Sequence, residues 1–275
     1  MNDRFIRGIA AIEEIVRVMK TGVTMPVECM LDNGQPVILK YPKNRAGSQV
    51  LPNELISYSI ADLIGVNIPF YGIGSLSGPV IENAVNFNCD EDMDLDEQNS
   101  GLCFYSFEIK NSVPLITGLV DKAENQEVEK LVLLDYIVNN TDRHDGNILF
   151  SLSEKKAFVI DFSHIITKKP ELIDRDYEML LSDESILSIE AYRGNRAIYD
   201  MLSLKGFDED YFMTLAKQIK NRLTSQVVDS VFARIPREWE SYWPKNNLEK
   251  IKAIINRRIQ LLEEAAVLIL KERKG

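Results

Sequence analysis

The chain has 275 residues and a formal net charge of −10, with 32 basic and 42 acidic side chains. Its content of 45% hydrophobic and 27% charged residues is typical of a folded globular protein, and it excludes a disordered chain, a collagen-like repeat or a disulfide-stapled miniprotein. The acidic balance argues against direct binding of nucleic acid, whose phosphates attract basic surfaces.

The cysteines and the apolar segments indicate a cytoplasmic protein. Cys29, Cys89 and Cys103 are widely separated, so they form neither a disulfide framework nor a metal-binding spacing. Residues 1–20 mix acidic and basic side chains and lack the apolar stretch of a signal peptide. The apolar run at residues 265–270 is far shorter than the roughly 20 residues that span a bilayer. We therefore expect a reducing, cytoplasmic setting and no membrane contact.

The first part of the chain predicts a β-rich region. Residues 15–20 are β-branched, and the segments VECML and PVILKY flank the turn Asp32-Asn33-Gly34. Asn and Gly tolerate the positive φ angles of a tight turn, which makes this a strong hairpin signal. We expect residues 15–41 to form a three-stranded meander, with Lys40 near the end of its third strand.

A helix is expected over residues 52–64, because Pro52 suits the first turn of a helix and Gly65 suits its end. The chain then turns back to extended and loop patterns up to about residue 110. We expect strands over residues 68–76 and 79–84, an acidic polar loop over 88–100, and an aromatic-rich apolar stretch over 102–109.

Beyond residue 110 the pattern becomes mostly helical. Residues 127–139 carry apolar side chains at helical spacing, and the segments NILFSL and AFVIDF predict a hairpin. The sequence thus predicts an α+β protein with a small β-rich lobe over residues 1–110 and a larger helical lobe over 111–275. Further helices are expected near residues 186–204, 208–221, 224–234 and 247–273.

Three oxygen-bearing side chains are predicted to meet at one end of that hairpin. Asn147 begins its first strand and Asp161 ends its second. If the turn is centred between residues 154 and 155, residue 148 faces residue 161, so the two side chains are neighbours. Asp142 lies in the loop just before, at the end of the expected helix over residues 127–139.

This arrangement is typical of phosphoryl transfer. Mg²⁺ prefers oxygen ligands and leaves part of its coordination to substrate phosphates. In kinases an Asp and an Asn bind the metal ions, and another Asp, five positions before the Asn, orients the attacking hydroxyl and accepts its proton. Asp142 and Asn147 have this offset, and Asp161 stands where the second metal-binding carboxylate is needed. The sequence therefore predicts a phosphoryl-transfer site that uses Mg²⁺.

The expected N-terminal lobe supplies matching groups. Lys40 can reach the α- and β-phosphates of a nucleotide, and Glu54, early on the next helix, can hold Lys40 in place. The turn TGVTMP between the first two strands offers the main-chain amides of Gly22, Val23 and Thr24 to the phosphates. With only one glycine, this turn is weak evidence by itself.

Together these segments resemble the HipA-like kinases, in particular the short forms without the long N-terminal extension of the HipA toxins. The resemblance covers most of the chain and is carried by TGVTMPVE, VILKYPKNRAGSQVLPNELI, NNTDRHDGNILF and VIDFSH. A looser similarity to the catalytic loop of phosphatidylinositol kinases is also present. The resemblance implies a two-lobed protein-kinase-like fold, ATP and Mg²⁺, with a Ser or Thr hydroxyl of a protein as the acceptor.

Carried across residue by residue, the resemblance makes Asp142 the catalytic base and Lys40 the phosphate-binding lysine. It makes Asn147 and Asp161 the metal ligands. It also places residues 104–108 at the hinge that faces the adenine, although no motif there fixes individual contacts.

The chain departs from the common protein-kinase pattern at two positions. Asp161 is followed by Phe-Ser instead of Phe-Gly, which argues against a kinase-style flip of that segment. Thr141 stands where many protein kinases have an Arg that senses a phosphorylated activation loop. We therefore expect no control through that ion pair.

Other chemistry-bearing residues favour structural roles. His144 and His164 lie beside the motif, where we expect them to support the loop by hydrogen bonds. Trp239 and Trp243, at helical spacing, suit core packing better than a substrate groove. Asp142 itself, taken alone, also suits a helix end or a turn.

An alternating run of acidic residues, Asp90, Asp92, Asp94 and Asp96, has the spacing of a calcium loop. Leu95 occupies the position that requires glycine, and Gly101 occupies the position of the bidentate Glu. We therefore expect a solvated acidic loop.

Two alternatives stay open at the level of the sequence. The first is a small-molecule or lipid kinase on the same fold, because no residue identifies the acceptor. The second is a non-catalytic nucleotide-sensing module that binds a regulatory or antitoxin-like protein partner. The presence of Asp142, Asn147 and Asp161 favours catalysis, and the net charge of −10 disfavours an anionic lipid surface.

Overall fold

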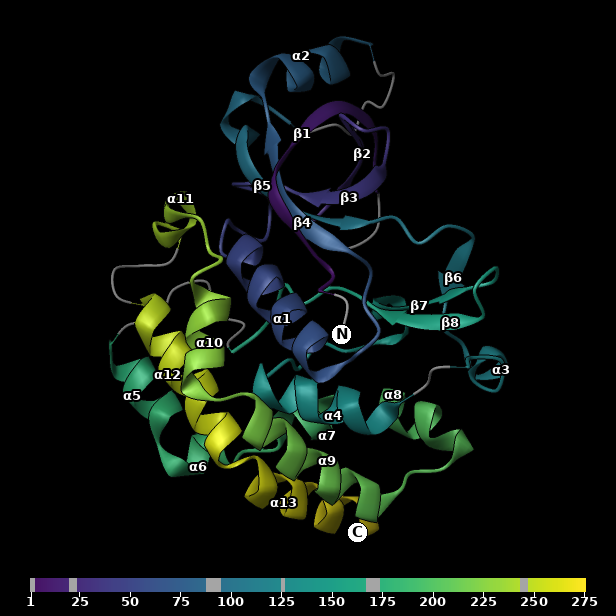
Figure 1. Cartoon of the computed structure of the whole chain (residues 1–275), viewed down its shortest axis with the longest axis vertical. Helices are drawn as coiled ribbons and strands as arrows, with labels where there is room; N and C mark the ends of the chain where they lie inside the picture. The colour runs from purple at the N-terminus through teal and green to yellow at the C-terminus, as the bar shows by residue number, and fades with distance from the viewer. Residues whose placement is uncertain (1–2, 20–23, 88–94, 125–126, 167–173, 243–246) are drawn as a thin grey trace.

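The computed structural model describes residues 3–19, 24–87, 95–124, 127–166, 174–242 and 247–275. A small β-barrel stands at one end of the molecule and a larger body of helices at the other (Figure 1). The predicted mixed α+β architecture, β-rich first and helical afterwards, is confirmed. The predicted lobe boundary at residue 110 falls between the last barrel strand and the next strand.

The barrel closes in the order β1-β2-β3-β5-β4. Its strands pair antiparallel, except that β1 runs parallel to β4. The predicted meander is confirmed in β1, β2 and β3, and β5 corresponds to the expected apolar stretch. The five strands are β1 (Phe5–Val18), β2 (Val27–Leu31), β3 (Pro36–Lys40), β4 (Tyr71–Leu76) and β5 (Gly101–Phe107).

Strand β1 is ten residues longer at its start than the sequence predicted, and this length is what closes the barrel. Its second half pairs with β2, while its first half pairs with β4. The register with β4 shifts between Ile6 and Ile9, around Gly8, whose φ of 93° lies in the left-handed region. The shift interrupts the alternation of apolar and polar side chains, so the first half of the strand carries no clear period-two signal.

The turn between β2 and β3 is formed as predicted. The main-chain N–H of Gly34 donates to the carbonyl of Leu31 at 2.9 Å, and Gly34 has a φ of 76°. The side-chain oxygen of Asn33 accepts from the N–H of Gln35 at 3.0 Å. Inside the barrel a compact apolar core forms, with fully buried residues that include Val27, Cys29, Val37, Leu39, Cys103 and Tyr105.

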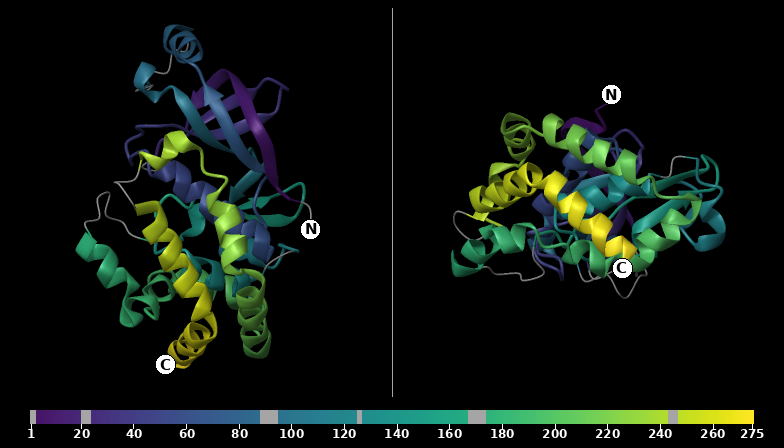
Figure 2. Two further views of the ribbon diagram at one scale, coloured as in Figure 1. Left: turned by 60° about the vertical axis from the view of Figure 1, so that its left-hand side comes forward. Right: turned by 90° about the horizontal axis from the view of Figure 1, so that it is seen from below.

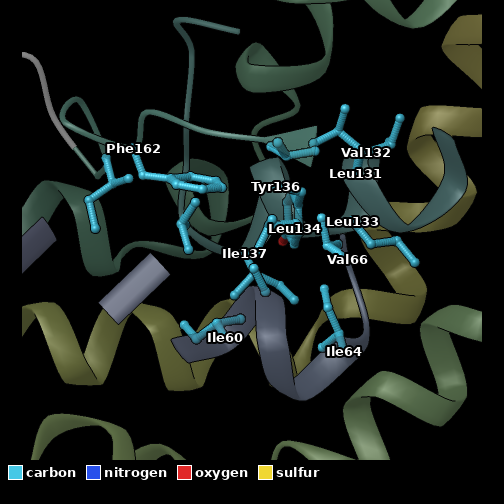
Figure 3. Packing of buried hydrophobic residues seen from close by; sticks show 14 of the residues in the cluster. Ile60, Ile64, Val66, Leu131, Val132, Leu133, Leu134, Tyr136, Ile137 and Phe162 are labelled. Atoms are coloured by element: carbon cyan, nitrogen blue, oxygen red, sulfur yellow. The ribbon is translucent and has the colours of Figure 1, made fainter. Parts of the chain in front are cut away.

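Helix α1 (Val50–Ile64) follows β3 and is buried on almost every side. It ends at Gly65, which adopts the left-handed conformation with a φ of 78° that favours glycine. Its apolar side chains do not join the barrel core. Ile60 and Ile64 pack beside Leu134 and Ile137 of the helical body, within one large core (Figure 3). Each such fully buried side chain stabilises the fold by roughly 1.5–3 kcal/mol.

The helical body is built around α4 (Val128–Ile137), in which every residue except Lys130 is buried. A three-stranded sheet of order β6-β7-β8 lies between this body and the barrel (Figure 1). Helices α12 and α13 run along one side of the body (Figure 2). Among the described residues, no helix is long and apolar enough to cross a membrane.

The remaining elements range from three residues to the 14 residues of α9 and α12. They comprise α2 (Gly78–Phe87), η1 (Glu97–Asn99), β6 (Ser112–Pro114), α3 (Thr117–Val120), η2 (Asp145–Asn147), β7 (Ile148–Ser151), β8 (Lys156–Val159), α5 (Asp174–Leu181), α6 (Asp183–Ile186), α7 (Glu190–Gly194), α8 (Arg196–Leu202), η3 (Ser203–Lys205), α9 (Glu209–Arg222), α10 (Ser225–Phe232), α11 (Arg237–Glu240), α12 (Asn247–Gln260) and α13 (Leu262–Lys274).

Three predicted elements are wrong or incomplete. Residues 79–84 form part of helix α2 instead of a strand, because Ile81 and Ala84, three positions apart, are the side chains that become buried. The helix expected over residues 186–204 is divided into short helices, and the one over 247–273 breaks at Leu261. The first interruption includes Gly194 and Asn195, residue types with low helix propensity, at the junction of α7 and α8.

Candidate active site

Lys40 is the last residue of β3, and its ammonium group is the centre of a buried polar cluster. Its Nζ lies 2.5 Å from Glu54 Oε1 and 2.9 Å from Asp161 Oδ1. It also donates to the hydroxyl of Ser163 at 2.8 Å. The predicted pairing of Lys40 with Glu54 is therefore present, and Asp161, 121 positions away in the chain, joins it.

Glu54, in the second turn of α1, is almost fully buried, with 1% of its side chain exposed. Its Oε1 accepts from Lys40, from the main-chain N–H of Phe162 at 2.9 Å and from the hydroxyl of Ser163 at 3.0 Å. Burial raises the pKa of the Glu54 carboxyl, and the nearby positive charge of Lys40 opposes this effect. Glu54 thus fixes both the lysine and the segment after β8.

Asp161 lies two residues after β8, in a left-handed conformation with a φ of 57°. Burial by itself would raise the pKa of this carboxyl, but the positive charge of Lys40 and the hydrogen bonds from Lys40 and Ser163 hold it well below the usual value. Its Oδ1 accepts from the hydroxyl of Ser163 at 2.7 Å and from the main-chain N–H of Ser163 at 3.2 Å. Because 34% of the side chain is exposed, the ionised carboxylate remains reachable from solvent.

Ser163 is a site residue that the sequence analysis missed. It occupies the place of the glycine in the common Asp-Phe-Gly pattern, and its hydroxyl contacts Lys40, Glu54 and Asp161 at once. Its carbonyl accepts from the side-chain amide of Asn53 at 2.8 Å. The serine therefore ties the segment after β8 to helix α1, and its unusual place after Asp161-Phe162 was the only available signal.

Asp142 sits in the loop after α4, where its main chain is held from both sides. Its N–H donates to Asn140 Oδ1 at 3.1 Å, and its carbonyl accepts from Asn147 Nδ2 at 2.9 Å. The side-chain nitrogen of Asn147 donates this bond, so the side-chain oxygen is the atom of Asn147 that can coordinate a cation. The predicted proximity of Asp142 and Asn147 is therefore present.

Arg143 fastens this loop to the rest of the site. Its buried guanidinium is paired with Asp135 of α4, with Nη2 at 3.0 Å from Oδ1, and it donates from Nη1 to the carbonyl of Ile160 at 2.6 Å. It also lies over the ring of Phe162, 4.6 Å from the ring centre. Nη1 further reaches the carbonyls of Asn147 and Asp161, both at 3.4 Å. One side chain thus bridges the segments that carry both candidate metal ligands.

Asn195 and Tyr199 complete the support beneath the loop. Asn195 Oδ1 accepts from the N–H of Arg143 at 3.0 Å, and its Nδ2 donates to the carbonyl of Asn140 at 2.7 Å. The hydroxyl of Tyr199 donates to Asp135 Oδ2 at 2.8 Å. The sequence analysis missed this support. The carboxylate of Asp135, within the otherwise apolar run of residues 131–138, was the one signal that could have found it.

The hairpin register differs from the expected one by two residues. Ile148 pairs with Val159, so the turn is centred between residues 153 and 154. A shift of two keeps every side chain on the same face of the sheet, and the N–H of Ile160 donates to the carbonyl of Asn147 at 3.0 Å. Asn147 and Asp161 therefore remain neighbours, although they are not directly opposed.

The other predicted residues fall in several places. Thr24 is buried beside the start of β2, while Gly22 and Val23 lie outside the described residues. The exposed ring of His144 accepts from the N–H of Gly146 at 3.1 Å, which agrees with a loop-supporting role. Trp239 is fully buried, as expected for core packing. Outside the described residues lie Cys89, Asp90, Asp92, Asp94 and Trp243.

The donor set suits a hard cation. Within the described ranges, no group of three or more His, Cys, Asp or Glu side chains has the geometry to hold a metal ion. Asn147 and Asp161 instead offer one amide oxygen and one carboxylate, which is the kind of partial oxygen set that Mg²⁺ completes with phosphates and water. The residues present therefore fit a magnesium ion that is shared with a nucleotide.

The fold is that of two-lobed kinases. The chain is similar to the Helicobacter pylori proinflammatory kinase CtkA, with a TM-score of 0.51 and 12% identity over 89% of this chain and 95% of that chain. It is also similar to the Golgi casein kinase with Mn/ADP bound, with a TM-score of 0.52 and 11% identity over 96% of this chain and 74% of that chain. No match was found among the curated proteins.

Sequence comparison defines the family. The HipA-like kinase model matches residues 12–180, which is more than half of the chain. The chain therefore belongs to the HipA-like kinases, as its motifs predicted, and the class of activity is that of a phosphotransferase. The matched range contains all five of the residues around which the site is built, namely Lys40, Glu54, Asp142, Asn147 and Asp161.

Proposed function

We propose that this kinase transfers the γ-phosphate of ATP, in the presence of Mg²⁺, to a Ser or Thr hydroxyl of a protein. The observation that carries the proposal is the position of Lys40 Nζ between Glu54 and Asp161. Through Arg143, the main chain of Asp161 is linked to the loop that contains Asp142 and Asn147. A cation, a metal-binding carboxylate and a candidate base within one short region are what phosphoryl transfer requires.

Lys40 binds the α- and β-phosphates through its ammonium group, and Glu54 keeps that group in position. The main-chain amides of Gly22, Val23 and Thr24 cover the phosphates from the turn between β1 and β2. The adenine faces residues 104–108 at the end of β5. These assignments rest on the family and on the contacts of Lys40.

Asn147 and Asp161 hold Mg²⁺ through the amide oxygen and the carboxylate. The ion, when bound, neutralises charge on the phosphate oxygens. The low pKa of Asp161 supports this role, because the carboxylate stays ionised at neutral pH. Arg143 supports it as well, since it fixes the main chain at both ligands.

Asp142 acts as the base for the acceptor. Its carboxylate orients the hydroxyl and takes the proton as the oxygen attacks the γ-phosphorus, while the bond from that phosphorus to the β-bridging oxygen breaks and ADP leaves. The hydrogen bonds at the main-chain N–H and carbonyl of Asp142 support this role.

The acceptor class is tested by transfer from γ-labelled ATP with Mg²⁺ to three sets of acceptors, namely lysate proteins, lipid vesicles, and a dialysed small-molecule fraction. We expect label on a protein band that yields phosphoserine or phosphothreonine after acid hydrolysis. Label found only in lipid or in the small-molecule fraction would contradict a protein acceptor, while it would still support kinase activity. Bound nucleotide without any transfer would instead support a nucleotide-sensing module.

The Asp142→Asn variant is the negative control, and Asp145→Asn is its matched partner. Asp145 lies in the same loop, but its side chain is 67% exposed, and it accepts from the N–H of Gly146 at 2.9 Å. We expect transfer to be lost in Asp142→Asn and kept in Asp145→Asn.

A further inference from the structure

The segment 225–242, which contains α10 and α11, crosses from the helical body to the barrel lobe. Helix α10 packs against α1, and α11 lies beside β5 (Figures 1 and 2). Along the chain, α1 and β5 both precede this segment by more than 100 residues. This C-terminal segment therefore touches the elements that carry Glu54 and the hinge.

Arg234, just after α10, makes the first polar connection. Its Nη1 lies 3.2 Å from the hydroxyl of Tyr71, at the start of β4, and 3.4 Å from the hydroxyl of Ser59 in α1. Its guanidinium lies over the ring of Phe5, 4.8 Å from the ring centre, and its Nη2 is 3.8 Å from Asp3. One side chain of the helical body thus contacts α1, β4 and the beginning of β1.

Trp239 of α11 makes the second connection. Its side chain is fully buried, and its indole Nε1 donates to the carbonyl of Leu102 in β5 at 3.1 Å. A buried indole N–H needs an acceptor, and this one finds it in the main chain of the other lobe. Trp239 therefore fixes the strand that leads into the hinge.

Helix α1 is buried as an internal helix would be. Thirteen of its fifteen residues are buried, and its apolar side chains belong to the large core shared with α4 and α12. A helix that is enclosed on every side has little freedom to swing as a rigid body, because any rotation would open cavities in a close-packed core. Glu54 is then held against Lys40 by the packing of α1 itself.

We propose that Arg234 and Trp239 are positioning residues for phosphoryl transfer: they hold α1 and β5 so that Glu54 keeps Lys40 in its phosphate-binding place without an external partner. This inference rests on the kinase function proposed above. In this view, the segment 225–242 of the same chain keeps Lys40 and Glu54 in contact.

The test uses the full-length chain with Arg234→Met and Trp239→Phe, singly and together. Both substitutions keep most of the apolar volume and remove the polar connections. Steady-state transfer from ATP is measured together with backbone hydrogen exchange in α1. The control is Arg257→Met, which removes an exposed ion pair with Asp183 in the helical body.

We expect the double variant to lose up to about 100-fold in kcat, with a smaller change in KM for the acceptor, because a small displacement of a positioning group costs rate. Exchange should rise in α1 while α4 and α9 keep the exchange of the wild type. Unchanged exchange in α1, or an equal rise throughout the chain, would overturn the proposal. A wild-type chain that transfers no phosphate would refute the kinase function instead, and the exchange of α1 would still decide the positioning role.

Discussion

The two halves of the site are held in place by different kinds of interaction. Around Lys40, opposite charges stand in direct contact, with Glu54 and Asp161 on one ammonium group. Around Asp142, the main chain makes neutral hydrogen bonds: its N–H donates to Asn140 Oδ1, and its carbonyl accepts from Asn147 Nδ2. The first half therefore depends on charge balance, which suits the binding of polyphosphate and a cation. The second half depends on the position of the backbone in the loop after α4.

The largest effect is expected for Asp142→Asn, which breaks the second half alone. The amide keeps the shape of the side chain but does not accept a proton, so kcat should fall by about 10²–10⁴-fold. Turnover of ATP is the measurement, with Asp145→Asn beside it. A variant Asp142→Asn that retains more than a tenth of the wild-type kcat would remove Asp142 from the role of base.

Arg143→Met breaks the bridge that joins the halves. It leaves Asp135 buried without its cation, so the free energy of unfolding should fall by about 3–5 kcal/mol. Urea unfolding measures the change. The matched Arg257→Met, which loses an exposed ion pair, should cost less than about 1 kcal/mol. Equal losses in the two variants would contradict the bridging role.

The charge-held half predicts a pH dependence. The pKa of Asp161 is lower in the folded chain than the value of 3.8 for a free carboxyl. The unfolded chain therefore binds more protons below about pH 4, and the stabilisation by Asp161 is complete above that value and is lost as the pH falls through the folded pKa. The difference in unfolding free energy between wild type and Asp161→Asn should be largest near pH 7 and shrink between pH 4 and 2. A difference that is constant with pH would contradict the ion pair.

The smallest effect is expected for Arg17→Ala on the barrel surface. Arg17 pairs with Glu28 across β1 and β2, but 60% of its side chain is exposed. Solvent weakens such a pair, so the unfolding midpoint and the turnover should both stay at the wild-type values. A clear loss of turnover would show that charge outside the buried cluster also controls the site.

The sequence predicted the parts of the fold that have a local cause. The turn at Asn33-Gly34 and the end of α1 at Gly65 follow from residues that accept positive φ angles. The separation of Asp142 from Asn147 was visible as a spacing, and Lys40 was visible as a strand-end lysine. Membership of the HipA-like kinases could also be predicted, because the motifs of this family are short and contiguous in the sequence.

The parts that were missed depend on contacts between distant segments. Ser163 meets Lys40 only because the segment after β8 passes the end of β3, and Arg143 meets Asp135 only because the loop folds back on α4. The strand predicted over residues 79–84 failed because burial of Ile81 and Ala84 against the barrel outweighed the β-branched composition. Trp239 was correctly expected to pack, but its acceptor in β5 has no signature in the sequence.

The division of the site is tested most directly by calorimetry. It measures the binding of ADP with Mg²⁺ to the variants Lys40→Met and Asp142→Asn. Both variants should first unfold cooperatively, which establishes that they are folded. The account predicts that Lys40→Met loses affinity by about tenfold or more, because one charge-assisted phosphate contact is removed, and that Asp142→Asn binds like the wild type. Wild-type affinity in Lys40→Met, or lost affinity in Asp142→Asn, would contradict the assignment of binding to one half and transfer to the other.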